Sequence, residues 1–324
     1  GADSGRIGRV SSHGGTKAVV AALVANGFIA VTKFGAWALT GASSMLAEAV
    51  HSVADTGNQI LLLIGGRSAQ KEATAEHPFG YGRERYISAF LVSIILFSLG
   101  GLFALYEAIH KYEEIAAGHP NELLEGPWWW VPIAVLVAAI IAESFSFRTA
   151  IRESTPAKGN QSWGRFIRTA KSPELPVILL EDLAALLGLT FALMGVGMTL
   201  LTHDGIWDVV GTAMIGLLLI GVAVTLAIET KSLLLGEAAA PEAVERIRRT
   251  LDAADGVDRV IHLKTLHLGP DEVLVAAKIA VEPTLAAARV AEVINNAEAA
   301  IRAAEPIVTA LYLEPDIDTA TVPR

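Results

Sequence analysis

Residues 43–66 read SSMLAEAVHSVADTGNQILLLIGG, an apolar run with polar side chains at regular intervals. The run is long enough to cross a hydrocarbon layer, which requires about 20 residues. It therefore predicts a membrane-spanning helix with a polar stripe along one side. Four polar side chains follow one another at spacings of 3, 4 and 3 positions, which form one stripe on an α-helix: Glu48, His51, Asp55 and Asn58.

This stripe lies too deep in the predicted membrane to face lipid. His51 and Asp55 are each more than about 10 Å from the nearer interface, at a helical rise of about 1.5 Å per residue. An ionisable group at that depth costs several kcal/mol unless it faces a partner or water. A histidine and an aspartate four positions apart can bind one cation through imidazole nitrogen and carboxylate oxygen. The alternative is a polar cluster that joins helices, but four such groups in one stripe favour a cation site.

The composition is typical of a membrane protein. Of the 324 residues, 52% are hydrophobic and 18% are charged, against about 25% charged residues in an ordinary soluble domain. With a net charge of −9, the composition argues against nucleic-acid binding. The sequence contains no cysteine, so a transition metal would have to be bound by His, Asp, Glu or Asn.

Six apolar runs are long enough to span a lipid bilayer. Lys and Arg concentrate before the first run and in the connections from the second to the third and from the fourth to the fifth, whereas the other three connections contain only Lys111. Because loops rich in Lys and Arg stay in the cytosol, we expect both termini to be cytosolic, in a bacterial inner membrane. The six runs are residues 17–40, 43–66, 85–110, 127–150, 174–201 and 206–231.

The connection between the fourth and fifth runs has two interpretations. Trp163, Phe166 and Ile167 stand among basic residues, which is typical of a short helix lying on the inner leaflet. The same composition also suits a solvated loop.

The chain divides into an apolar part, residues 1–236, and an acidic part, residues 237–324, with the composition of a soluble domain. The acidic part alternates between helical and strand patterns in the order helix, strand, strand, helix, strand. That order (αββαβ) predicts a small α+β domain with both helices on one face of a three-stranded sheet. The expected elements are residues 241–254, 257–268, 272–281, 283–304 and 307–313.

The fifth apolar run contains two adjacent acids, Glu181 and Asp182. Neighbouring helix positions point about 100° apart, so at most one of the two can face the same ion squarely. Asp182 lies at a depth similar to that of Asp55, which predicts that the second and fifth spans hold one ion between them. The alternative is a carboxylate pair bound by basic neighbours.

Other polar residues of the predicted spans give weaker signals. Asn26 is expected to hydrogen-bond to another helix, and Lys33 to extend its ammonium group toward the membrane interface. Glu143 is interpreted as structural.

These motifs together resemble those of the cation diffusion facilitator family, and the resemblance covers nearly the whole chain. It rests on Lys33, Thr40-Gly41, the His51-x-x-x-Asp55 pair and the segment HPFGYGRE at residues 77–84. It implies a divalent-metal/proton antiporter with a metal site shared by the second and fifth spans. It also implies a homodimer with cytosolic, ferredoxin-like tails of metallochaperone type. Residues 177–185, VILLEDLAA, resemble the branch that contains the mitochondrial-type zinc transporters.

The sequence departs from the family pattern at several ligand positions. Ile178 stands where the family has a His or Asp four residues before Asp182, so the fourth ligand is open between Glu181, Asn58, Asn26 and water. A second family site often uses a histidine where Tyr81 stands, and we expect that site to be absent. The tail is also expected to lack the family's metal pair, because its ligand positions hold Ile261, Lys278 and Tyr312.

The predicted function is therefore export of a divalent transition metal, with protons as the counter-ion and no organic cofactor. One histidine with carboxylates suits Zn²⁺, and also Mn²⁺, Fe²⁺, Co²⁺ or Cd²⁺. A first alternative is a membrane-embedded metallohydrolase with Glu181 or Glu48 as general base, although no HExxH motif is present. A second alternative is a non-transporting metal sensor or scaffold.

Overall fold

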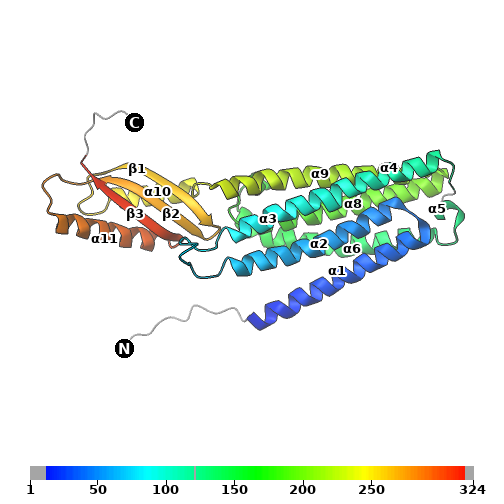
Figure 1. Cartoon of the computed structure of the whole chain (residues 1–324), viewed down its shortest axis with the longest axis horizontal. Helices are drawn as coiled ribbons and strands as arrows, with labels where there is room; N and C mark the ends of the chain where they lie inside the picture. The colour runs from blue at the N-terminus through cyan, green and yellow to red at the C-terminus, as the bar shows by residue number, and fades with distance from the viewer. Residues whose placement is uncertain (1–11, 120–121, 318–324) are drawn as a thin grey trace. The chain divides into compact units, whose positions relative to one another are not determined.

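The computed structural model describes residues 12–119 and 122–317, and the side chains of these residues except 12–25 and 122. Three basic residues before or at the start of the first predicted span lie outside this description: Arg6, Arg9 and the side chain of Lys17. Long helices account for most of the chain, and a small sheet follows them (Figure 1).

Each predicted span corresponds to a helix or to a continuous helical segment. Their bounds are α1 Ser12–Thr40, α2 Ser43–Ser68, α3 Glu84–Ile95 continued by η1 Leu96–Leu102 and α4 Phe103–Ala116, α6 Trp130–Lys158, α8 Glu174–Thr202 and α9 Ile206–Leu235. A short helix, α5 Glu122–Glu125, was not predicted. Another, α7 Trp163–Thr169, supports the helical interpretation of the connection around Trp163.

Among the described residues, four helical segments are long and apolar enough to cross a membrane. They are the predicted third to sixth spans: Glu84–Ala116, Trp130–Lys158, Glu174–Thr202 and Ile206–Leu235. The side chains of α1 are described only from residue 26, and α2 carries the polar stripe. The full count of six spans stays a prediction.

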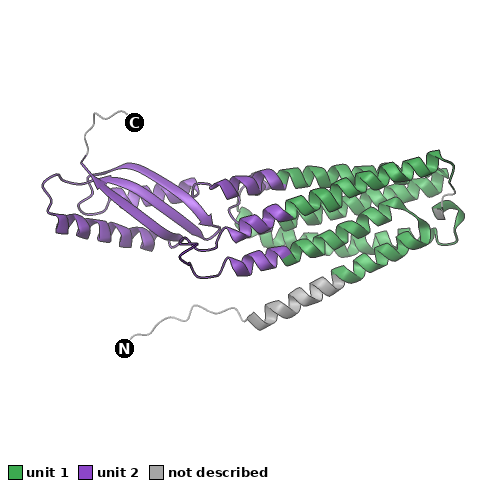
Figure 2. Ribbon diagram, viewed as in Figure 1, with its two compact units in different colours: residues 1–60, 92–159, 177–225 green, residues 61–91, 160–176, 226–324 purple. Residues whose placement is uncertain are grey.

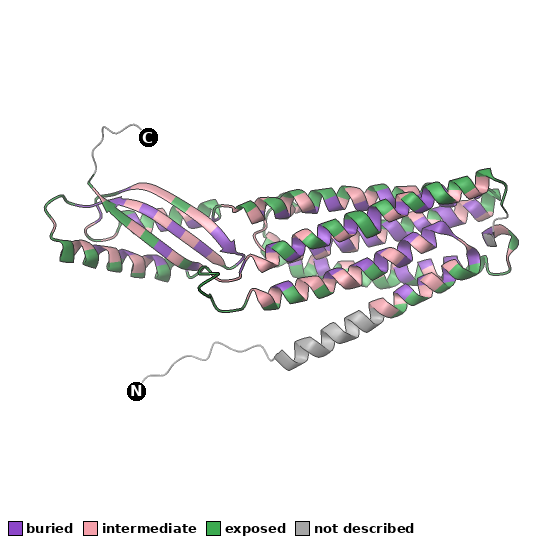
Figure 3. Cartoon of the chain, in the orientation of Figure 1, coloured by how far each residue is buried: buried purple, intermediate pink, exposed green. Residues whose placement is uncertain are grey.

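The chain forms two compact units (Figure 2). Unit 1 comprises residues 1–60, 92–159 and 177–225, and unit 2 comprises residues 61–91, 160–176 and 226–324. Unit 1 turns large apolar side chains outward, among them Phe28, Phe145 and Leu217. Exposed and buried positions alternate along its helices (Figure 3). An apolar outer surface of this kind suits contact with lipid.

Within unit 1, α8 and α9 pack closely because glycines meet at their contact. A Cβ atom added to Gly195 would lie 2.9 Å from the carbonyl oxygen of Trp207, and one added to Gly211 would lie 2.8 Å from that of Phe191. Small residues at such a contact let two membrane helices approach backbone to backbone. The helix that carries Glu181 and Asp182 is therefore tightly joined to α9.

The C-terminal domain has the predicted order of elements: α10 Pro241–Asp252, β1 Arg259–Gly269, β2 Glu272–Ala280, α11 Ala287–Ala304 and β3 Val308–Asp316. The sheet order is β1-β2-β3, with β1 and β2 antiparallel and β2 and β3 parallel. Helix α11 begins four residues later than predicted, because Leu285 bonds back to Glu282 in a turn and Ala286 is extended. Strand β3 runs to Asp316, which pairs with Ala280 of β2.

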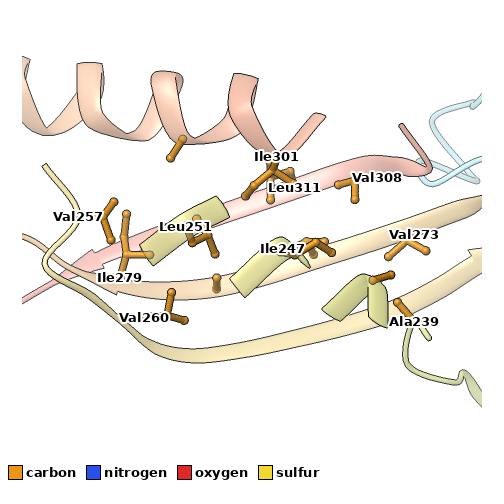
Figure 4. Close-up of a cluster of buried hydrophobic side chains, with 14 of the residues drawn as sticks. Ala239, Ile247, Leu251, Val257, Val260, Val273, Ile279, Ile301, Val308 and Leu311 are labelled. Atoms are coloured by element: carbon orange, nitrogen blue, oxygen red, sulfur yellow. The ribbon is translucent and has the colours of Figure 1, made fainter. Parts of the chain in front are cut away.

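One hydrophobic core holds this domain together (Figure 4). Both helices contribute buried side chains at helical spacing, such as Ile247 and Leu251 of α10 and Ile301 of α11. Alternate residues of β2, from Val273 to Ile279, belong to the same core, so both helices cover one face of the sheet. Each fully buried aliphatic side chain contributes about 1.5–3 kcal/mol to the free energy of unfolding.

The two histidines of β1 differ in environment. His267 is 3% exposed and its Nδ1 lies 3.0 Å from the carbonyl oxygen of Gly269, whereas His262 is half-buried. Burial lowers the pKa of the His267 imidazole below its ordinary value. Lys278, at one of the ligand positions of the family, lies 3.0 Å from carboxylate oxygens of both Glu314 and Asp316.

We expect the C-terminal domain, expressed from Glu237 onward, to fold and self-associate in the presence of chelator. Its apolar core is formed by side chains of both helices and of the sheet, and the Lys278 ammonium group lies against two carboxylates. Sedimentation velocity and circular dichroism in EDTA measure both properties. A domain that stays monomeric or unfolded in EDTA and dimerises only on addition of Zn²⁺ would contradict this expectation.

Candidate metal centre

The structure buries the polar stripe of α2 inside unit 1. Glu48, His51 and Asn58 are at most 1% exposed, and Asp55 is 21% exposed. Several of their polar atoms have no hydrogen-bond partner in the described part of the chain. These atoms are Glu48 Oε1, both ring nitrogens of His51, Asp55 Oδ1 and Asn58 Oδ1. Buried polar atoms are almost always paired in folded proteins, so a row of unpaired ones points to a binding site.

His51 and Asp55 form the first half of this site. His51 Nε2 lies 3.5 Å from Asp55 Oδ2, one helical turn away. This distance is too long for a strong hydrogen bond, so the nitrogen lone pair and the carboxylate stay free to act as ligands.

Glu181 and Asp182 of α8 form the second half. Asn58 Nδ2 donates to Glu181 Oε1 over 2.6 Å, and this bond joins α2 to α8 within unit 1. The carboxylates of Asp55, Glu181 and Asp182 are close enough for their charges to interact. Helices α2 and α8 therefore meet at the polar stripe, and the ion expected between them stays a prediction.

A third helix reaches the site through a residue that the sequence did not reveal. Ser146 of α6 donates its hydroxyl hydrogen to Asp182 Oδ2 over 2.9 Å. Ser146 follows Glu143 by three positions, so the two share a face of α6. The position of Ser146 on the same face as Glu143 was the only sequence signal for it. A serine in an apolar helix is too common to identify a site.

Two other candidates have partners of their own. Asn26 Nδ2 of α1 donates to Gln59 Oε1 over 3.3 Å, as expected of a residue that hydrogen-bonds between helices. The expectation that Lys33 extends toward the membrane interface is wrong: its side chain is 4% exposed and forms a 3.0 Å ion pair with Glu48.

The segment after α2 holds the aromatic residue predicted to replace a family ligand. The His77 and Tyr81 rings lie 4.6 Å apart between centroids, and the Lys71 ammonium group lies 5.8 Å from the Tyr81 ring centre. His77 thus packs against an aromatic ring.

Over residues 12–119 and 122–317, no three His, Asp or Glu side chains are grouped closely enough to surround a metal ion. The predicted ligands stand as two pairs, which we call half-sites: His51 with Asp55 on α2 and Glu181 with Asp182 on α8. That one metal ion is shared by the two pairs stays a prediction. Binding a cation to both would draw α2 and α8 side chains together.

A buried carboxylate at the start of α9 anchors the helix that carries the first half-site. Asp208 is 2% exposed and accepts hydrogen bonds from the backbone nitrogens of Ser43 and Ser44, at 2.7 and 3.3 Å. It also accepts from both serine hydroxyls. Asp208 thus caps the N-terminus of α2 from another helix, where the helix dipole favours a negative charge.

We expect Asp208→Ala to destabilise unit 1 strongly, because it leaves the Ser43 and Ser44 donors buried and unpaired. Each such donor costs about 1–3 kcal/mol. Thermal unfolding of the purified protein in detergent measures the loss. Asp204→Ala is the matched control, since Asp204 is exposed just before α9 and accepts one bond from Ile206. Equal melting temperatures for both variants would contradict the anchoring role.

Comparison with known proteins adds to this geometry. The profile of the cation efflux transmembrane domain matches residues 19–235, and that of the cation efflux protein cytoplasmic domain matches residues 239–315. The chain is 31% identical to a mouse (Mus musculus) protein named mitochondrial proton-coupled zinc antiporter SLC30A9, over 81% of this chain and 45% of the mouse protein. It is 28% identical to metal tolerance protein C4 of Arabidopsis thaliana, over 81% of this chain and 56% of that protein.

Other relatives and solved structures match smaller parts of the chain. Zinc transporter ZitB of Pectobacterium atrosepticum is 29% identical over 41% of this chain and 39% of its own. Among solved structures, a variant of the MamM C-terminal domain matches 24% of this chain and 92% of its own, at 23% identity and a TM-score of 0.23. The chain spans about half the length of the SLC30A9 relatives it matches.

Proposed function

Because this chain belongs to the cation efflux family, the cation diffusion facilitators, we propose that it exports a divalent transition metal, foremost Zn²⁺, in exchange for protons. One observation supports the proposal: a row of buried polar atoms on α2 that have no hydrogen-bond partner among the described residues, close to the acidic pair of α8. The chain is a membrane protein and, on this proposal, a secondary transporter and not an enzyme.

The proposed ligands are His51, Asp55 and Asp182, with Glu181 as the fourth. The printed names of the relatives, a zinc antiporter and a zinc transporter, support Zn²⁺ as the cargo. The donor set suits Mn²⁺, Fe²⁺, Co²⁺ and Cd²⁺ as well, because carboxylates and imidazole bind all of these ions. Asn58 holds Glu181 in place through its amide, and Asn26 is engaged with Gln59 and stays outside the ligand shell.

Proton exchange follows from the chemistry of these ligands. Only a neutral imidazole and ionised carboxylates bind a metal well, so metal binding displaces protons from them. When the site opens on the opposite side of the membrane, protons return to the same groups and the metal leaves. Alternating access of one site thus couples outward metal flow to inward proton flow.

The proposed architecture has two parts. Residues 1–236 form a six-span membrane domain, and residues 237–324 form a cytosolic domain that joins two copies in a homodimer. The match of residues 239–315 to the cytoplasmic domain of the family supports this division. We further propose that both termini lie in the cytosol, in a bacterial inner membrane; the excess of Lys and Arg on one side supports this orientation.

Metal flux into proteoliposomes tests the function. The purified protein, reconstituted into vesicles with an acidic lumen, is expected to take up external Zn²⁺ and to alkalinise the lumen. Competition with Mn²⁺, Fe²⁺, Co²⁺ and Cd²⁺ then ranks the cargo. Hydrolysis of peptides or lipids without Zn²⁺ flux would favour the metallohydrolase, and neither activity would favour the sensor or scaffold.

A further inference from the structure

Lys33 is a buried cation within the membrane unit, and all its donor capacity is used. Its ammonium group donates to Ser52 Oγ at 2.8 Å, to Glu48 Oε2 at 3.0 Å and to the Glu48 carbonyl oxygen at 3.5 Å. These bonds join α1 to α2 on the face that carries the first half-site, since Glu48 lies three positions before His51. Lys33 is also close enough to His51 and Asp55 for its charge to act on them.

The other side of the Glu48 carboxylate lies against α8. A Cβ atom added to Gly188 would lie 2.6 Å from Glu48 Oε1, so this oxygen closely approaches the α8 backbone. The side chain of Glu48 is fully buried between Lys33 of α1 and Gly188 of α8. It therefore connects the three helices one turn away from His51.

We propose that Lys33 is a built-in counter-charge that holds Glu48 and keeps its carboxylate out of the metal's ligand shell. This inference rests on the proposed metal site. Binding of Glu48 to the metal would separate it from Lys33 and leave a buried ammonium group unpaired beside an incoming dication. Burying an unpaired charge costs far more than the pair itself contributes, so the pair persists when the metal binds. The charged ligands then reduce to Asp55, Glu181 and Asp182.

Neutral variants at positions 33 and 48 distinguish a Glu48 that is held by Lys33 from a Glu48 that binds the metal. The set is Lys33→Met, Glu48→Gln and the double variant Lys33→Met/Glu48→Gln, with Zn²⁺ affinity measured by titration calorimetry on purified full-length protein. Glu48→Gln alone is expected to weaken Zn²⁺ binding at least about tenfold, because it frees the Lys33 charge next to the site. The double variant is expected to bind Zn²⁺ within about threefold of wild type, since neither charge remains.

The control pair is Lys111 and Glu114, which lie 3.1 Å apart at the end of α4 with Glu114 exposed. The variants Lys111→Met, Glu114→Gln and their double should leave Zn²⁺ affinity unchanged. An equal loss of affinity in Glu48→Gln and in the Lys33→Met/Glu48→Gln double would make Glu48 a ligand and overturn the proposal. Wild-type affinity in every variant at positions 33 and 48 would also overturn it.

Thermal unfolding in EDTA gives a readout that does not depend on metal transport. Each single variant is expected to lower the melting temperature, and the double variant to recover most of the loss, because the pair is buried. If a single variant does not fold, the affinity of the double variant against wild type still decides between the two roles. If the wild type does not bind Zn²⁺ but the double variant still recovers the melting temperature, the proposed function is contradicted. The Lys33–Glu48 contact between α1 and α2 is then still supported.

Discussion

Replacing Asp55 or Asp182 by alanine is expected to abolish Zn²⁺ transport while leaving a folded protein. Each change removes a charged ligand from a site with few replacements, so flux should fall at least about 100-fold, at or beyond the upper end of what outer-shell partners cause. The fold should survive, because Asp55 Oδ1 has no hydrogen-bond partner in the described part of the chain and Asp182 has Ser146 as its partner. Flux into proteoliposomes and size-exclusion chromatography measure both effects.

The Asp204→Ala variant is the control here as well, because Asp204 is an exposed acid of unit 1 outside the site. It should transport Zn²⁺ at the wild-type rate. Normal flux in either Asp55→Ala or Asp182→Ala would refute a site shared by α2 and α8. Loss of flux with aggregation would show that the acids stabilise the fold and would leave their role in binding undecided, so Asp55→Asn and Asp182→Asn are measured in parallel.

The elements of this fold follow from local patterns in the sequence. Long apolar runs predicted the membrane-unit helices. Strand patterns on both sides of Gly269-Pro270-Asp271 predicted the β1–β2 hairpin. The polar stripe of α2 could be predicted from the sequence, because helical spacing alone brings its residues onto one face. The start of α11 was harder to predict from the sequence, because the turn at Glu282 and the extended Ala286 compete with helix formation after Pro283.

Contacts between distant segments could not be predicted in the same way. The Asp208 anchor joins residues 164 and 165 positions apart, and nothing near Asp208 in the sequence distinguishes it from an ordinary helix-start residue. The partner of Lys33 was missed for a related reason. A single lysine in an apolar run suits extension to the interface as well as burial, and only the packing of α1 on α2 decides. The π-helical segment at Leu96–Leu102 likewise has no sequence signal that we identified.

The role of Glu181 depends on what replaces the family ligand at Ile178. Position 178 lies one helical turn before Asp182 and on the same face, and isoleucine offers no donor atom there. Glu181 points about 100° away from Asp182, but it is buried and its Oε1 is held by the Asn58 amide at 2.6 Å. That hydrogen bond turns one carboxylate oxygen toward α2, the helix with His51 and Asp55, and leaves the second oxygen available to a metal or to a bound water.

Glu181→Gln, which keeps the size and removes the charge, is therefore expected to lower Zn²⁺ affinity at least about tenfold. Adding Ile178→His to that variant should recover part of the loss, because it restores a nitrogen ligand on the face of Asp182. Titration calorimetry on the single and double variants measures both steps, with Ile178→Leu as the control for a change of shape without a donor. Wild-type affinity in Glu181→Gln would reduce Glu181 to a structural partner of Asn58. A loss that Ile178→His does not reverse would mean that the site needs the negative charge of Glu181 and not only a fourth donor atom.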